Sequence, residues 1–174
     1  MNNSDLREHL VCKVAHQIPN IGKTGMMKAM YFLQQIYKVP LGYDFNIYNY
    51  GPYDEDVLVT LDCAEKGGFI NIQSTFYENG VTGYEISAKT DVPLAPEYSE
   101  HIDKISKNFN KYTAKQWELT STIVYLYVAY NENDWNFDEL DDNVQRIKPH
   151  FDIETIKAER NRLENLNILS DAIQ

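Results

Sequence analysis

The strongest constraint on the fold of this chain is a Gly-Pro step among three tyrosines, in the segment Tyr48-Asn-Tyr-Gly-Pro-Tyr-Asp54. Gly-Pro dipeptides mark turns, because glycine tolerates unusual backbone angles and proline fixes its own φ. The aspartate that follows is a good helix N-cap. Apolar residues then recur at helical spacing from Val57 to Ala64. The segment therefore predicts a tyrosine-rich turn that leads into a helix at Asp54.

The patterns on both sides of this turn predict a winged helix. Glycines end the helix after the turn, and an Asn-Gly pair between two strand-like segments is a hairpin signal. Three helices followed by a hairpin is the element order of a winged helix, with the hairpin as the wing. The helical patterns cover residues 4–18, 26–37 and 54–66, and the strand patterns cover residues 69–77 and 82–87.

The rest of the chain is predicted to be helical. A segment with two prolines, residues 91–96, is the expected linker. Two stretches have capping-box spacing, and an aspartate caps the last helix. We therefore predict a helix-dominated α+β protein. Its winged-helix-like part, residues 1–92, packs with a helical C-terminal part, residues 93–174, as one compact unit. The later helices are expected at residues 98–109, 113–130, 136–148 and 152–166.

The composition disfavours a nucleic-acid partner. The formal net charge is −10, and 13 of the 174 residues are tyrosines, which suit half-exposed packing and protein interfaces. In a DNA-binding winged helix, the helix at 54–66 would enter the major groove. Its carboxylates would face phosphates, so nucleic acid is not expected there; a basic partner, or solubility alone, fits the charge. The acidic residues are Asp54, Glu55, Asp56, Asp62 and Glu65, against Lys66.

The sequence offers little support for catalysis or for a metal site. The four histidines are scattered, and none forms a pair at ligand spacing. Cys12 and Cys63 fall within apolar-periodic segments, so both are expected to be buried thiols in a reducing compartment. The stretch from Ile21 to Thr24 resembles the end of a P-loop but lacks the earlier glycine. We therefore assign no catalytic residue, metal or cofactor.

The ends and the apolar stretches of the sequence predict a cytoplasmic protein. Residues 1–8 have neither the basic segment nor the apolar segment of a signal peptide. The longest apolar stretch, residues 123–130, is too short to span a bilayer. No membrane partner is therefore expected.

The tyrosines of the turn have two possible roles. Tyr48, Tyr50 and Tyr53 could be aromatic anchors of a protein interface. They could instead fix the turn onto the helix at residues 28–32, with Pro52 at the first helical position. The two roles can apply to different tyrosines, and the sequence leaves them open.

The order of these motifs resembles a known family. The motifs are Lys28-Ala-Met-Tyr-Phe-Leu-Gln34, Tyr43-x-Phe45, the tyrosine turn with Asp54 at a position where serine is usual, and the stretch from Leu61 to Gly68-Phe-Ile70. Together they are similar to the SocA-like antitoxin domain, also called Panacea, and to YwgA-like uncharacterised prokaryotic proteins. Stretches near Thr120, Lys148 and Glu154 look closer to the YwgA-like branch.

The resemblance implies a binding protein and not an enzyme. Panacea-type domains neutralise toxins by direct contact, so the expected partner is a protein such as a toxin or a defence protein. Two alternatives are a winged-helix transcription regulator and a small hydrolase whose site forms only in the fold. Candidate contact residues are Tyr48, Tyr50, Tyr53, Asp54, Glu55, Asp56, Asp62 and Glu65. The motif residues expected to be structural are Lys28, Tyr31, Gly51, Pro52 and Gly68.

Overall fold

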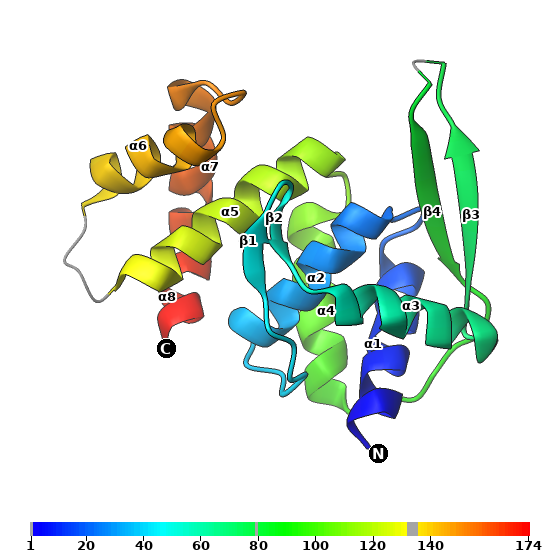
Figure 1. Cartoon of the computed structure of the whole chain (residues 1–174). Helices are drawn as coiled ribbons and strands as arrows, with labels where there is room; N and C mark the ends of the chain where they lie inside the picture. Colours follow the sequence, from blue (N-terminus) through cyan, green and yellow to red (C-terminus); the bar gives the residue numbers. More distant parts are fainter. Residues whose placement is uncertain (1, 79, 132–135) are drawn as a thin grey trace.

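The computed structural model describes residues 2–78, 80–131 and 136–174, and in them the chain is an α+β protein dominated by helices. Two antiparallel hairpins accompany the helices (Figure 1). The helices are α1 (Asn3–Gln17), α2 (Lys23–Gln35), α3 (Glu55–Lys66), α4 (Pro96–Phe109), α5 (Ala114–Tyr130), α6 (Phe137–Ile147), α7 (Ile153–Asn165) and α8 (Ile168–Ile173). The strands are β1 (Asn46–Tyr48), β2 (Gly51–Tyr53), β3 (Ile70–Phe76) and β4 (Thr82–Ala88).

The N-terminal part has the predicted winged-helix order. β3 and β4 follow α3 and pair in register from Ile70 opposite Ala88 to Phe76 opposite Thr82. Ile21, between α1 and α2, forms an antiparallel bridge with Ile86, whose amide donates to the Ile21 carbonyl at 2.9 Å. The far end of the hairpin extends beyond the helices as a wing (Figure 1). Asn79, part of the hairpin signal, lies outside the described residues.

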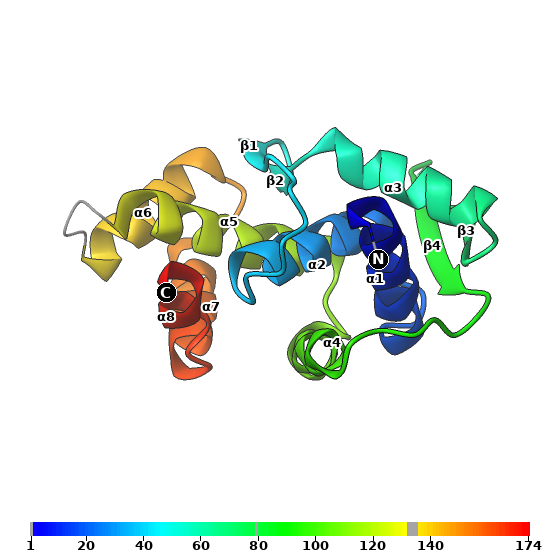
Figure 2. The same cartoon turned by 90° about the horizontal axis from the view of Figure 1, so that it is seen from below.

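α1 and α2 form a central layer that is covered on both sides. α3 and the β1–β2 hairpin lie on one side of this layer, and α4 lies on the other (Figures 1 and 2). The Phe32 ring of α2 lies 5.3 Å from the Phe109 ring of α4 and 5.9 Å from the Trp117 ring of α5, measured between centroids. The helical C-terminal part thus packs on the winged-helix-like part through a shared core. The division near residue 92 stays a prediction.

The helix ends follow the predicted caps. Thr113 with Gln116 and Asn136 with Glu139 form the two capping boxes, and Asp152 caps α7. α3 ends at Lys66, where Gly68 has a φ of +79°, a conformation that favours glycine. These ends were predictable because each depends on residues within one helical turn.

Two local predictions are wrong, and one helix was not predicted. Pro52 does not begin a helix, because it lies in β2 and α3 starts three residues later, after the cap Asp54. Cys63 is exposed, since it lies off the buried stripe of α3 formed by Val57, Thr60, Leu61 and Ala64. α8 was not predicted: Asn167, with a φ of +59°, separates this short helix from α7.

Gly51 is the point where the β1–β2 hairpin meets α5. Its φ is +90°, a backbone conformation that other residues rarely adopt. A Cβ at this position would lie 2.9 Å from Ser121 Oγ, 3.1 Å from Thr122 Oγ1 and 3.3 Å from the Glu118 carbonyl oxygen. The hairpin can therefore lie against α5 only with glycine at this position.

We expect Gly51→Ala to destabilise the fold by about 3 kcal/mol, because the methyl group adds overpacking to the backbone strain. Gly68→Ala is the matched control. Gly68 also has a positive φ, but a Cβ there meets nothing within 4 Å, so strain alone should cost about 1 kcal/mol. Urea denaturation of both variants measures the difference. Equal losses would show that the contact between hairpin and α5 is not tight.

Candidate functional site

The tyrosine turn is the loop of the β1–β2 hairpin, and two of its tyrosines point outward. Tyr48 is 65% exposed and Tyr50 is 67% exposed. Tyr53 is half-buried, and its ring lies 5.6 Å from the Tyr48 ring between centroids. The hairpin lies against α2 and α5 (Figure 1). Tyr48 and Tyr50 are therefore available to a partner, whereas Tyr53 also packs within the hairpin.

A buried lysine of α2 holds the hairpin from beneath. Lys28 is 2% exposed, and its Nζ donates a hydrogen bond to the Pro52 carbonyl at 2.6 Å. The pKa of Lys28 is lowered from its ordinary 10.5 to about 7, chiefly by burial and then by the nearby charge of Lys148, while Glu118 opposes both effects. Sequence analysis assigned Lys28, Gly51 and Pro52 a structural role, and the structure brings the three together.

A second buried lysine holds the other side of the turn. Lys148, at the end of α6, donates from Nζ to the Tyr48 carbonyl at 3.3 Å and to the Asn49 carbonyl. The same Nζ lies 3.0 Å from Glu118 Oε1, and both side chains are 5% exposed. His150 Nε2 is 3.3 Å from that oxygen.

The contact between Lys148 and Glu118 is an ion pair. Glu118 Oε1 has no aligned hydrogen bond from the described residues, although two nitrogens lie close to it. Because the carboxylate and the Lys148 ammonium balance each other, a second full positive charge on Lys28 is disfavoured. The cluster of Lys28, Glu118, Lys148 and His150, called the lysine cluster below, thus joins α2, α5 and the segment after α6 beneath the turn.

The acidic residues of α3 divide into two groups. Glu55, Asp56 and Asp62 are exposed. Asp54 caps the helix and also accepts a hydrogen bond from the Asp44 amide, and Glu65 accepts one from the Ile72 amide at 2.7 Å. Asp54 and Glu65 therefore have roles in the fold, while the exposed carboxylates form an acidic face.

The other two motif residues lie apart from the lysine cluster. Tyr31 is buried in α2, where its ring contacts Phe32 and Phe45, and burial raises its pKa. Gly68 ends α3. Both have local roles in packing and in helix termination.

Cys12 and His16 are residues that a hydrolase site formed only in the fold could use. Cys12 Sγ lies 3.3 Å from the carbonyl oxygens of both Phe69 and Thr90, and its single S–H can donate to either of them. Burial and the nearby Asp91 charge raise the pKa of Cys12. A raised pKa disfavours the nucleophilic thiolate. His16 is exposed at the end of α1. Within the described ranges, no three His, Cys, Asp or Glu side chains could share a metal ion.

The described residues also contain no helix that is long and apolar enough to span a membrane.

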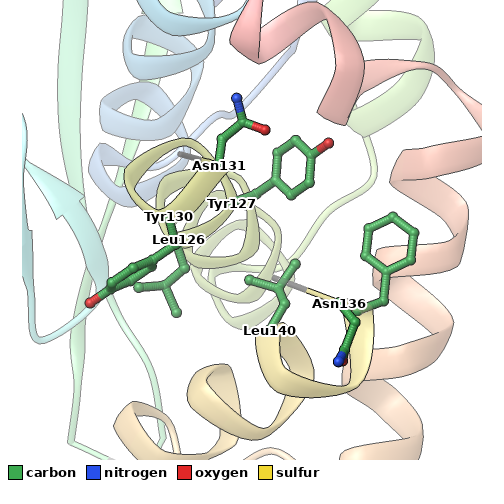
Figure 3. Close-up of a pocket in the computed structure, with 7 residues that line it drawn as sticks. Leu126, Tyr127, Tyr130, Asn131, Asn136 and Leu140 are labelled. Carbon is green, nitrogen blue, oxygen red and sulfur yellow. The ribbon is translucent and has the colours of Figure 1, made fainter. Parts of the chain in front are cut away.

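A cavity of about 410 Å³ lies between α5 and the start of α6 (Figure 3). The residues around it are Leu126, Tyr127, Tyr130, Asn131, Asn136, Phe137 and Leu140. This lining, taken over the described residues, has no carboxylate, imidazole or thiol. Asn136 is committed to capping α6. The cavity therefore offers apolar and aromatic contact but no acid–base pair.

Searches of family models, curated proteins and solved structures found no match to this chain.

The sequence did not indicate Glu118, Lys148 and His150 as candidate site residues, although Lys148 and His150 lie in a stretch that resembles the YwgA-like branch. They come from two segments about thirty positions apart, and neither segment has a spacing that indicates the contact. One signal was present for their neighbour: Lys28 stands in a run from Met26 to Leu33 that is otherwise almost entirely apolar. A charged residue in such a run indicates a buried polar contact.

The pKa of Lys28 predicts a pH-dependent stability. Between about pH 7 and 10 the unfolded chain holds the lysine proton and the folded chain does not, so the free energy of unfolding rises with pH. Below pH 7 both states hold the proton and this dependence vanishes. Relative to Lys28→Met, the wild type should gain at most about 1.4 kcal/mol per pH unit in that window.

Urea denaturation at pH 6, 7, 8 and 9 measures this difference. Lys115→Met, which removes a lysine from the exposed side of α5, is the matched control. If the free energies of unfolding of the wild type and Lys28→Met changed in parallel with pH, the lowered pKa of Lys28 would be contradicted.

Proposed function

We propose that this chain is a non-enzymatic protein-binding module that contacts its partner through Tyr48, Tyr50 and the exposed acidic face of α3. The observation that carries the proposal is the exposure of two tyrosines on a turn whose backbone is fixed by buried lysines. Large aromatic side chains on ordered backbone are typical anchors of protein interfaces.

The fixed backbone matters for affinity. A partner that binds a mobile loop must order it, which costs free energy. Here the carbonyls of Tyr48 and Pro52 already accept hydrogen bonds from the two lysines. The hairpin is therefore already ordered in the free protein. Binding then does not have to offset the entropy of ordering it, so the contacts of the two tyrosines add to the affinity without this loss.

The charge of the surface suggests the chemistry of the partner. Glu55, Asp56 and Asp62 are exposed on the helix that follows the hairpin, and Val59 is exposed among them. Carboxylates around apolar contacts favour a partner with a basic rim and speed its association. An antitoxin-like or defence-related role, with a toxin or defence protein as partner, is the specific form of the proposal and depends on the motif resemblance.

A DNA-binding regulator is the second candidate, because the bridge between Ile21 and Ile86 completes a winged-helix arrangement. The exposed carboxylates of α3 would face the phosphates in the usual docking geometry, which disfavours binding. Gel shifts with genomic fragments at low salt test it. Saturable binding that weakens with salt would favour the regulator over the protein-binding module.

The double variant Tyr48→Ala/Tyr50→Ala should lose its partner. We expect the wild type to recover a stoichiometric protein from its native host. The double variant should bind the purified partner at least about tenfold more weakly, because interface tyrosines are frequent hot spots. Phe76→Ala is the matched control, since Phe76 is 79% exposed on β3, outside this surface.

The proposed surface would be contradicted if no stoichiometric partner were recovered. It would also be contradicted if the double variant and Phe76→Ala lost the same amount of affinity for the partner. Unfolding curves of both variants establish that they remain folded.

A further inference from the structure

A second cavity lies at the opposite end of α2 from the wing, where aromatic rings gather. Its volume is about 320 Å³. α2, the segment before β1 and the C-terminal half of α5 contribute its walls. The lining residues are Tyr31, Gln34, Gln35, Tyr43, Asp44, Phe45, Tyr125, Val128 and Ala129.

The four rings of this lining form a continuous series. The Tyr31 centroid lies 5.2 Å from that of Phe45 and 6.3 Å from that of Tyr125, and Phe45 lies 5.5 Å from Tyr43. The interplanar angles are 75°, 43° and 61°, so the rings face in different directions. Tyr31 and Tyr43 are buried, and Arg7 covers the Tyr43 ring. The half-buried rings of Phe45 and Tyr125 therefore offer the faces at this cavity. The negative faces of aromatic rings attract organic cations.

The charges around the cavity also favour a cation. Asp44 is an exposed member of the lining, and the carboxylates of Asp54 and Asp56 act on Tyr43 from nearby. Arg7 already places its guanidinium 4.1 Å from the Tyr43 ring centroid, while donating to the Leu41 and Gly42 carbonyls. Asp56 Oδ2 lies 4.0 Å from this guanidinium, and Asp44 adds an exposed carboxylate to the lining of the cavity.

The hydroxyls of Tyr31 and Tyr43 remain neutral at physiological pH. Burial raises the pKa of Tyr43 to about 12 and also raises that of Tyr31. Tyr43 is further held by a hydrogen bond of 2.9 Å between its hydroxyl and Thr60 Oγ1. The rings therefore contribute as neutral aromatic faces, and Asp44 provides the negative charge.

We propose that this cavity, called the aromatic cavity below, binds an organic cation: an alkylammonium or guanidinium group. The group could be the side chain of a lysine or arginine from another protein or a free quaternary amine, since the rings and Asp44 recognise the same chemistry in both. This site is independent of the surface formed by Tyr48 and Tyr50.

Titration of the free protein with defined cations tests the site. The probes are tetramethylammonium chloride, N-acetyl-lysine N-methylamide and N-acetyl-arginine N-methylamide, with sodium chloride at equal ionic strength as the salt control. The readout is the aromatic ¹H–¹³C NMR spectrum. We expect saturable shifts of the Tyr31, Phe45 and Tyr125 signals with at least one organic cation and none with sodium chloride.

Asp44→Asn should weaken binding by about threefold to tenfold, because it removes the carboxylate from the lining of the cavity but keeps the side-chain shape. The polar contacts of Asp44 within the protein use its backbone amide and carbonyl, so the substitution leaves them in place. Asp62→Asn, on the exposed face of α3, is the matched control and should not change the affinity.

Tyr125→Leu should also weaken binding, and Tyr125→Phe should restore it, because the aromatic face and not the hydroxyl makes the contact. Tighter binding of the capped amino acids would indicate a protein side chain as the ligand, and tighter binding of tetramethylammonium would indicate a free amine.

Shifts that do not saturate, shifts matched by sodium chloride, or equal affinity in wild type and Asp44→Asn would overturn the proposal. The titrations do not involve the proposed protein partner. Their outcome therefore stays valid if the protein-binding proposal fails.

Discussion

The hydrogen bond from Lys28 Nζ to the Pro52 carbonyl is the interaction on which the arrangement of the hairpin depends. A buried ammonium is costly unless its charge and its donors are satisfied. The two buried lysines satisfy this requirement in different ways. Lys148 is balanced by Glu118, and Lys28, next to that balanced pair, has a pKa lowered to about 7. The glycine at position 51 then allows the hairpin to lie directly on α5. Polar contacts and close packing thus fix the same short segment.

This arrangement separates the structural residues of the turn from those available for binding. The backbone carbonyls point to the lysine cluster, whereas the side chains of Tyr48 and Tyr50 are exposed. Different atoms of one segment therefore fix the turn and carry the proposed contacts with a partner. The aromatic cavity is formed by other rings, from α2, the segment before β1 and α5, and is proposed as a second, separate place for recognition.

The sequence predicted the features that depend on neighbours along the chain. The capping residues and the periodic apolar stripes located α1 to α7 to within about three residues, and the element order predicted the winged helix. The β1–β2 hairpin was not predicted, because its three-residue strands are stabilised by Lys28, Lys148 and α5, which are distant in sequence. The same reason applies to the buried pair of Arg160 and Asp141, whose Nη2 and Oδ2 atoms lie 2.8 Å apart between α7 and α6. The candidate contact residues were selected from the tyrosine turn and the acidic helix after it, and they stay a prediction. The buried lysines beneath the turn became visible only in the structure.

Backbone ¹⁵N relaxation of residues 46–53 tests the central claim most directly, namely that the lysine cluster holds the tyrosine turn rigid in the free protein. If the account is correct, the order parameters of these amides are about 0.85, as in α2 and α5, and they fall in Lys28→Met. Order parameters below about 0.6 in the wild type would show a mobile turn and would contradict the claim.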